Sequence, residues 1–310
     1  MSGESRARGG MRPAGGRNGT VARAERRATP LAGDRTAREE APATRARPVV
    51  VKLGGRALEA PGALREFVLG LARLSRVTLL VHGGGAEVTS WCERLGLAPR
   101  FVDGLRVTDE DTLEVATAVL AGLANKRLVA ALRAEGVDAV GLAALDGGTL
   151  VATAHPEARD LGAVGAIASL DASLLATLLA DGRTPVLASV AADESGALLN
   201  VNADDAAAAI AVAVGASDLV LLSDTPGLVL HGRRVPALAA GELAGTLARA
   251  DVSGGMRPKL RAAGAALQGG VARVHIAAWR GPKTLEALLA GDGGGTMLHA
   301  NGTLVEERHA

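Results

Sequence analysis

Short apolar runs alternate with amphipathic segments from residue 48 to about residue 290. Runs rich in valine and leucine predict buried strands, and apolar residues spaced three or four positions apart predict helices. The predicted strands are 48–53, 77–81, 137–142, 184–190, 218–223 and 272–276. The predicted helices are 61–74, 86–96, 110–134, 171–181, 203–214, 256–268 and 283–290. This alternation predicts an α/β fold, a three-layer αβα sandwich with an open, mostly parallel central sheet.

Shorter pieces of alternating pattern interrupt this order. Segments 149–154, 163–169 and 197–201 predict hairpins that extend from the sheet edge and would form a lid over substrate. The stretch 101–108 predicts another hairpin. Thr108 and Asp111 have the spacing of a capping box for the following helix, so the acidic cluster there is interpreted as a helix start rather than a metal site.

The composition is that of a globular body with an aliphatic core. The chain is 48% apolar with a mean hydropathy of +0.22, and it has no Tyr, two Phe and two Trp. Aromatic stacking on nucleic-acid bases is therefore not expected. The single cysteine, Cys92, excludes an internal disulfide, and no Cys/His spacing matches a zinc site. A reducing cytoplasm is the expected location, and no run of about 18 apolar residues predicts a membrane span.

The net charge of +1 hides an asymmetry between the two parts of the chain. Residues 1–47 hold 11 Arg and 5 acidic residues, so this part carries +6 and the remainder carries −5. Because it has almost no large apolar residues, the segment 1–47 is predicted to be a disordered tail without a secretory signal. A nucleic-acid-binding arm is the alternative interpretation. Residues 301–310 are interpreted as a C-terminal tail.

Only four of the 34 basic residues are lysines, and two of them lie near paired glycines. Lys52 ends an apolar run just before the glycines at 54–55, and Lys259 closes the stretch that begins with the glycines at 254–255. An ammonium group is a compact point charge, whereas a guanidinium is a planar fork. Lysines retained in so arginine-rich a chain therefore indicate a site for phosphate. The other two lysines lack such neighbours and are interpreted as surface residues.

A second glycine-rich turn follows strand 77–81. It reads His82-Gly83-Gly84-Gly85 and leads into a helix, so backbone N–H groups converge at a positive helix end that suits an anion. The same string forms the oxyanion hole of lipase-like hydrolases, but the Gly-x-Ser-x-Gly elbow of that class is absent. The Walker lysine loop is absent too, and Val88 occupies the place of the third glycine in a dinucleotide fingerprint.

Polar residues cluster ahead of helix 203–214, in the sequence Asn200-Val201-Asn202-Ala203-Asp204-Asp205. One such residue is enough to cap the helix, so the surplus indicates ligands or partners for the lysines. Arg106, in the predicted hairpin, is either a surface residue or a bidentate clamp for a carboxylate.

Taken in order, these motifs resemble the amino acid kinase family and, within it, the acetylglutamate kinases. They are Lys-Leu-Gly-Gly at 52–55, His-Gly-Gly-Gly at 82–85, Gly-Leu-Arg-Val-Thr at 104–108, Asn-Val-Asn-Ala-Asp at 200–204, Leu-Leu-Ser-Asp at 221–224 and Gly-Gly-Met-x-x-Lys at 254–259. Each motif is weak alone, but the ordered set is specific. The resemblance implies one kinase domain over 48–300, with an acyl-acceptor lobe at about 48–180 and a nucleotide lobe at about 181–300.

The resemblance also implies a reaction and a set of site residues. The reaction is transfer of the γ-phosphoryl group of ATP, bound with Mg²⁺, to the side-chain carboxylate of N-acetyl-L-glutamate in arginine biosynthesis. The implied catalytic residues are Lys52, Lys259 and Asp204, and the implied acceptor-binding residues are Gly84, Gly85, Arg106 and Asn200. The implied nucleotide-binding residues are Gly54, Gly55, Asp224, Gly227 and Ser253. No protein side chain is implied as a metal ligand.

One stretch departs from the family pattern. Ala143 and Ala144 stand before Asp146 where relatives often have Ser-Gly, in a loop that lies near substrate in those relatives. A kinase of a longer, N-blocked 2-aminoadipate in lysine biosynthesis is therefore one alternative, and a non-catalytic amino-acid-binding regulator on the same fold is another. Arginine-inhibited relatives join dimers into hexamers through an N-terminal amphipathic helix. Because this tail has none, a homodimer without strong arginine inhibition is expected.

Overall fold

The computed structural model describes residues 47–54, 62–102, 104–156 and 161–300. Contacts group Arg45–Ala310 into one compact unit. The predicted tails, apart from Arg47, lie outside the described residues, and so does Gly55.

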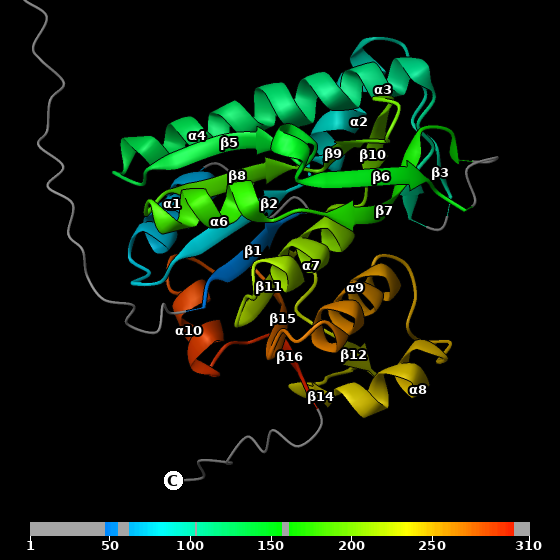
Figure 1. The fold of residues 1–310 in the computed structure, drawn as a ribbon. Coiled ribbons are helices and arrows are strands. Elements are labelled where there is room, and N and C mark those ends of the chain that lie inside the picture. The colour runs from blue at the N-terminus through cyan, green and yellow to red at the C-terminus, as the bar shows by residue number, and fades with distance from the viewer. Residues whose placement is uncertain (1–46, 55–61, 103, 157–160, 301–310) are drawn as a thin grey trace, which may run out of the picture. The chain divides into compact units, whose positions relative to one another are not determined.

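An eight-stranded sheet runs through the middle of this body (Figure 1), in the strand order β14-β16-β15-β11-β1-β2-β8-β5. The strands are β1 Val49–Leu53, β2 Thr78–His82, β5 Ala139–Ala143, β8 Thr184–Ala188, β11 Asp218–Ser223, β14 Ala237–Ala239, β15 Arg273–Ala278 and β16 Thr296–His299. Neighbouring strands are parallel from β15 to β5, and β16 runs antiparallel to β15. The predicted mostly parallel central sheet is therefore present.

Helices cover both faces of the sheet (Figure 1), which completes the predicted αβα sandwich. One face carries α6 Ser173–Ala180, α7 Ala203–Ala213 and α9 Met256–Gln268. The other face carries α1 Ala63–Ala72, α4 Asn125–Ala134 and α10 Thr284–Ala290.

Side chains of β1 alternate between these two faces. Val50 belongs to the core beneath α7, whereas Val49 and Val51 belong to the core beneath α1 and α4. Because the side-chain period of a strand is two residues, Lys52 lies on the same face as Val50. The chain thereby directs this lysine toward α7.

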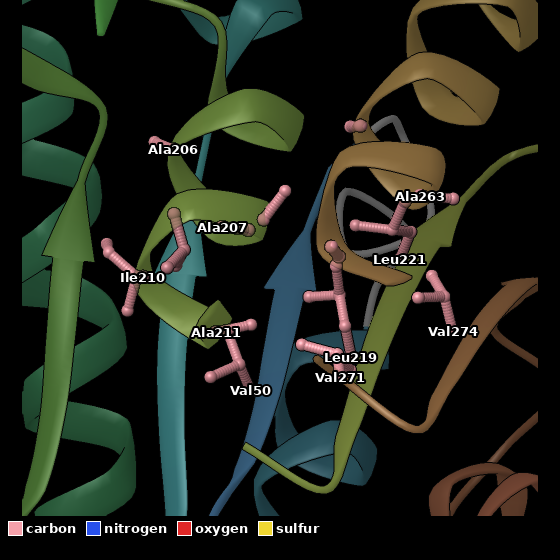
Figure 2. Close-up of a cluster of buried hydrophobic side chains, with 14 of the residues drawn as sticks. Val50, Ala206, Ala207, Ile210, Ala211, Leu219, Leu221, Ala263, Val271 and Val274 are labelled. Carbon is pink, nitrogen blue, oxygen red and sulfur yellow. The ribbon is translucent and has the colours of Figure 1, made fainter. Parts of the chain in front are cut away.

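Small side chains let α7 lie close to the sheet. Figure 2 shows Ala207 and Ala211 of this helix on the side toward Val50 of β1 and Leu219 of β11, and all four residues belong to one buried cluster. Alanine keeps the helix and strand backbones close, and a fully buried aliphatic side chain contributes about 1.5–3 kcal/mol by leaving water. This packing positions the first turn of α7 with respect to β1.

The predicted helix 110–134 is continuous but changes its winding. It consists of α3 Glu110–Thr117, a π-helical segment Ala118–Ala124 and α4. The predicted capping box is wrong, because the carboxylate of Asp109 accepts the N–H of Thr112 at 3.0 Å. Thr108 is instead buried, and its hydroxyl donates to the Arg106 carbonyl.

The same helix, Glu110–Ala134, is long and apolar enough to cross a membrane by length and composition. No membrane span was predicted from the sequence, because polar residues interrupt the apolar runs of this segment. In the structure Leu128 and Leu132 are buried against the sheet, as in a core helix.

Two smaller sheets complete the half of the molecule that holds α2 Gly85–Arg94. The predicted hairpin near residue 101 is present as β3 Phe101–Val102 and β4 Leu105–Arg106. The other predicted hairpins are instead part of a closed four-stranded sheet in the order β10-β7-β6-β9. The sheet closes because β9, which follows β8 directly, pairs with both β10 and β6. These strands are β6 Leu150–Ala154, β7 Val164–Leu170, β9 Val190–Ala192 and β10 Leu198–Val201.

The second half contains short elements that were not predicted from the sequence. They are β12 Val229–Leu230, β13 Arg233–Arg234, β14, α8 Leu243–Leu247 and β16. Strands β8, β9 and β10, which follow residue 180, pair with strands that precede it, so the sheets continue across the predicted lobe boundary.

Arg47 connects the start of β1 to the ends of two helices. Its guanidinium donates to the carbonyls of Gly215 at 2.8 Å, Ala216 at 2.9 Å and Gly270 at 3.1 Å. These carbonyls follow α7 and α9, where the helix dipoles are negative, so a cation is favourable there. Arg47, which the sequence analysis assigned to the tail, belongs with the body.

Asp218 is a fully buried carboxylate at the start of β11. It accepts hydrogen bonds from Arg273 Nε at 2.8 Å and Ser217 Oγ at 2.8 Å, and His275 Nε2 lies 3.2 Å away. Burial alone would raise the pKa of Asp218, but the hydrogen bonds from His275, Ser217 and Arg273 outweigh burial and hold that pKa well below its ordinary value. The ionised carboxylate therefore fastens β11 to β15.

Replacing Asp218 by Asn is expected to lower the free energy of unfolding by about 3 kcal/mol at neutral pH, because its cationic partners lose their anion. The folded-state pKa lies below the unfolded value of about 3.9, so the carboxylate stabilises the fold above that pH and this contribution is lost as the pH falls. Urea titrations should show the gap between wild type and Asp218→Asn narrowing from about pH 5 to about pH 2.

The control is Asp138→Asn, which removes a half-exposed partner of Arg133. Its effect should stay below about 1 kcal/mol. Equal losses in the two variants would contradict this account of Asp218.

Candidate active site

The carboxyl ends of β1, β2 and β11 meet in the middle of the sheet, where ligands bind in open α/β folds. A cavity of about 250 Å³ lies there. The predicted site residues that line it are Lys52, Gly54, Gly84, Gly85, Arg106, Asn200 and Asp204. The structure thus brings residues from both halves of the chain to one place.

Asp204 bridges the two lysines singled out by the sequence. Lys52 Nζ lies 2.7 Å from Asp204 Oδ1, and Lys259 Nζ lies 2.9 Å from Asp204 Oδ2. The three residues come from β1, the first turn of α9 and the first turn of α7. Asn202 caps α7 by accepting the Asp204 N–H at 2.8 Å, which leaves the Asp204 carboxylate to the lysines.

The two lysines favour the ionised form of the Asp204 carboxylate. Burial alone would raise the pKa of Asp204, but Lys52 and Lys259 outweigh burial and hold that pKa below its ordinary value. Burial lowers the pKa of Lys52, and the Asp204 carboxylate opposes this. Two ammonium groups share one carboxylate, so the cluster keeps a net positive charge that favours an anionic ligand.

Gly54 supplies the space that the Lys52 ammonium occupies. A Cβ on Gly54 would lie 2.1 Å from Lys52 Nζ. Residues 52 and 54 are two apart on an extended segment, so their side chains would point to the same face. The missing side chain at position 54 is therefore what lets Lys52 reach Asp204.

The two terminal nitrogens of the Arg106 guanidinium differ in their hydrogen bonding. Its Nη2 donates to the Gly85 carbonyl and to the Thr89 hydroxyl, both at 2.6 Å, and its guanidinium carbon lies 4.7 Å from the Phe101 ring centroid. Its Nη1 is buried and has no hydrogen-bond partner within the described part of the chain. Leaving a buried charged donor unpaired costs free energy, so this group is available to a carboxylate ligand.

Asn200 also belongs to the cavity wall. Its side-chain Nδ2 donates to Thr108 Oγ1 at 3.1 Å, and the Thr108 hydroxyl donates in turn to the Arg106 carbonyl at 2.9 Å. The Gly-Leu-Arg-Val-Thr and Asn-Val-Asn-Ala-Asp motifs are therefore joined by a hydrogen-bonded chain.

The remaining predicted residues do not line this cavity. Asp224 follows β11 and is exposed, and its carboxylate acts on the pKa of Lys52 in the same direction as Asp204. Gly227 has φ of 119°, and a Cβ there would lie 2.6 Å from Thr296 Oγ1. Ser253 lies in the loop before α9. Gly55 lies outside the described residues.

Other residues line the cavity but belong to none of the sequence motifs. Val88, Ala116, Leu120 and Ser189 belong to its wall. Apolar residues on a helix are ordinarily core, so the sequence offers no signal that these face a ligand.

The loop at 143–146, which suggested a longer acceptor such as 2-aminoadipate, does not line the cavity. Ala143 and Ala144 are buried, and the Ala143 N–H donates to the Asp146 carboxylate at 2.9 Å. The structure therefore gives the 2-aminoadipate alternative no support from this loop.

Sequence comparison identifies the family of this site. The model of the amino acid kinase family matches residues 47–278. The chain belongs to the amino acid kinase family. The resemblance inferred from the ordered motifs is confirmed.

Individual relatives agree with this assignment. The acetylglutamate kinase of Methanopyrus kandleri is 45% identical over 253 residues, which cover 79% of this chain and 98% of that protein. The acetylglutamate kinase of Rubrobacter xylanophilus is 45% identical over 260 residues, which cover 83% of this chain and 98% of that protein.

Solved structures share the architecture. N-acetylglutamate synthase from Neisseria gonorrhoeae, in complex with coenzyme A and N-acetyl-glutamate, has a TM-score of 0.70 and 27% identity over 82% of this chain and 60% of that chain. A carbamate kinase from Giardia has a TM-score of 0.63 and 15% identity over 83% of this chain and 99% of that chain, which shows a common fold. The predicted fold class is confirmed.

Lys52→Ala and Lys259→Ala are each expected to lower turnover by at least about 10²–10³-fold, because each removes a preorganised cation from a buried site. The fold should survive, since Asp204 keeps one lysine. Turnover would be measured on purified protein with native circular dichroism. Lys283→Ala, which changes an exposed lysine, serves as the control, and near-normal turnover in either site variant would exclude that lysine from catalysis.

Gly54→Ala is expected to lower turnover by a similar factor of about 10² or more, because the new methyl group displaces the Lys52 ammonium from Asp204. Gly245→Ala is the matched control, since a Cβ there meets no atom within 4 Å. Full activity in Gly54→Ala would show that Lys52 does not need its observed position.

Proposed function

We propose that this chain catalyses transfer of the γ-phosphoryl group of ATP to the side-chain carboxylate of N-acetyl-L-glutamate. The observation that carries this proposal is that Lys52 and Asp204, which also pairs with Lys259, line the same cavity as Arg106, whose Nη1 has no hydrogen-bond partner among the described residues. The acetylglutamate kinases that are 45% identical over most of their length support the choice of acceptor.

The reaction needs positive charge more than it needs a base. An acceptor carboxylate is already ionised at neutral pH, so its oxygen attacks the γ-phosphorus directly. A new P–O bond forms to the carboxylate while the bond from the γ-phosphorus to the β–γ bridging oxygen breaks. The products are N-acetyl-L-glutamyl 5-phosphate and ADP.

Repulsion between the anions is the main obstacle, and the two ammonium groups oppose it. Lys52 would contact the phosphoryl group as it moves, and Lys259 would stabilise the charge that develops on the leaving oxygen. Asp204 holds both groups in place before substrate arrives, so little reorganisation is needed during the reaction.

The acceptor would be bound at the other end of the cavity. Arg106 Nη1 would donate to its α-carboxylate, and Asn200 would fix its acetylamino group. The backbone N–H groups of Gly84 and Gly85, at the start of α2, would donate to anionic oxygens near the reacting centre. A non-catalytic regulator would need Arg106 and Asn200 but not the bridged lysines, so the regulator alternative is less well supported.

The nucleotide would lie toward the lobe formed by residues from about 181 to 300, near Asp224, Gly227 and Ser253. The described residues contain no cluster of three His, Cys, Asp or Glu side chains that could hold a metal ion, and both oxygens of Asp204 face lysines. The side chains therefore do not form a metal cage of their own. Mg²⁺ would enter on the phosphates of ATP.

We further propose that the chain acts as a cytoplasmic homodimer in arginine biosynthesis, with small molecules as its substrates.

The proposed function is tested by trapping the acyl phosphate as a hydroxamate. N-acetyl-L-glutamate, N-acetyl-L-2-aminoadipate and L-glutamate would be compared as acceptors with ATP and Mg²⁺. Product from N-acetyl-L-glutamate alone is expected. Preference for the longer acceptor would move the chain to lysine biosynthesis, and no product from any acceptor would overturn the proposal.

Arg106→Gln is expected to raise KM for N-acetyl-L-glutamate by about 10–100-fold, the effect of losing one charge-assisted hydrogen bond. KM for ATP should change little, because Arg106 lies in the wall of the proposed acceptor site. An unchanged acceptor KM would remove Arg106 from recognition of the α-carboxylate.

A further inference from the structure

The glycine turn at 83–85 separates two different environments. Alternation along β2 places Leu79 and Val81 beneath α7, and Leu80 beneath α1 and α4. His82, the last residue of β2, is thus on the α4 face, opposite the face from which Lys52 meets Asp204. His82 is 4% exposed and therefore cannot reach solvent for its hydrogen bonds.

The hydrogen bonds of His82 define its tautomer. Nδ1 lies 2.9 Å from the Gly83 carbonyl oxygen, and Nε2 lies 3.1 Å from Nδ2 of the Asn125 side chain. A carbonyl oxygen only accepts, so Nδ1 must carry the proton, and Nε2 is then free to accept from the amide. Burial lowers the pKa of His82 and keeps the ring neutral, as this pattern requires.

Asn125 is locked in the orientation that this pattern needs. It is fully buried, and its Nδ2 also donates to the Val186 carbonyl at 2.9 Å. Its Oδ1 accepts from Lys126 Nζ at 2.9 Å, so the amide cannot be reversed without opposing a donor to a donor. A Cβ on Gly141 would lie 2.2 Å from Asn125 Oδ1, so the adjacent strand leaves space for this amide.

The hydrogen bond from His82 to the Gly83 carbonyl also sets the direction of the Gly84 N–H, because both groups belong to one peptide bond. No peptide bond among the described residues is cis, and in a planar trans peptide the C=O and the following N–H point in opposite directions. The His82 ring draws the Gly83 carbonyl toward the α4 face. The Gly84 N–H of the same peptide is therefore aimed toward the cavity that holds Lys52 and Asp204.

The π-helical segment contributes a second contact to the same turn. Leu120 of this segment packs so closely on Gly84 that a Cβ there would lie 2.8 Å from its Cδ2. Asn125 follows directly where this segment passes into α4. The altered winding thus coincides with Leu120, which contacts the turn, and with Asn125, which contacts His82, and π-helical segments are frequent at functional sites.

We propose that His82 and Asn125 are positioning residues for phosphoryl transfer, which hold the Gly83 peptide so that the Gly84 N–H faces the reacting anions. This inference rests on the proposed function for its catalytic meaning. Neither residue lines the cavity that holds Lys52 and Asp204, although His82 borders a second cavity of about 440 Å³ on the other side of the turn. They act by fixing the direction of a backbone donor before substrate binds.

The tautomer of His82 is measured first, because it does not depend on activity. Nitrogen-15 NMR of histidine-labelled protein distinguishes a protonated Nδ1 from a protonated Nε2, and the signal absent from His82→Asn identifies this residue among the six histidines. The Nδ1–H form is expected. An Nε2–H form in the folded wild-type protein would overturn the proposal.

Three substitutions then separate orientation from stability. The amide nitrogen of Asn in His82→Asn can reach the place of Nδ1 and donate to the Gly83 carbonyl, whereas Gln reaches the place of Nε2 and Phe donates nothing. His82→Gln and His82→Phe should lose about 10–100-fold in kcat with little change in KM, and His82→Asn should keep most of the turnover.

A purely structural role predicts a different pattern. All three variants would then lose stability, and kcat per folded molecule would be the same in each. Wild-type kcat in His82→Phe, or equal impairment in Asn and Phe variants, would overturn the proposal. If wild-type protein forms no acyl phosphate, the proposed function fails on that result, while the NMR measurement still decides the geometry.

Discussion

The site depends on one buried carboxylate that is shared by two ammonium groups. Asp204 alone would not stay ionised at this depth, and Lys52 and Lys259 alone would repel each other. Each charge is therefore stabilised only when the other two are present. The three elements that carry these side chains must bring them to one place. The parallel sheet and its alanine-rich helices meet this requirement, because close packing of α7 on β1 leaves little freedom in where Asp204 lies.

The two faces of the sheet contribute different groups to the site. The α7 face supplies the charged groups, and the α4 face supplies neutral hydrogen bonds that end at the glycine turn. Glycine is needed between them because both faces come close to the backbone there, as the contact of Leu120 with Gly84 shows. A backbone donor with a supported direction can interact with charge that develops during the reaction without having to reorient.

Periodicity and motif order were enough to predict the main strands, the helices and the lysine–carboxylate cluster, because these depend on local pattern and on a family resemblance. Other features depend on which segments meet in space. The hydroxyl of Thr108 had an alternative acceptor in the Arg106 carbonyl, so Asp109 capped the helix instead. The closed sheet β10-β7-β6-β9 required a strand, β9, that the sequence pattern had merged with β8. His82 looked like part of an anion-binding motif, and only its contact with Asn125 gives it a different role.

Arg47 joins the two helices that carry Asp204 and Lys259, at the ends opposite the site. It holds the carboxyl ends of α7 and α9 through Gly215 and Gly270, while Asp204 and Lys259 lie in the first turns of the same two helices. With about 1.5 Å of rise per residue, these helices extend roughly 16–20 Å from that anchor. A small change in the angle between the two helices at Arg47 would therefore displace Asp204 and Lys259 more than it displaces the residues near Arg47. Arg47, the first described residue of the chain, is therefore expected to influence the separation of two charged groups that lie at the opposite ends of these helices.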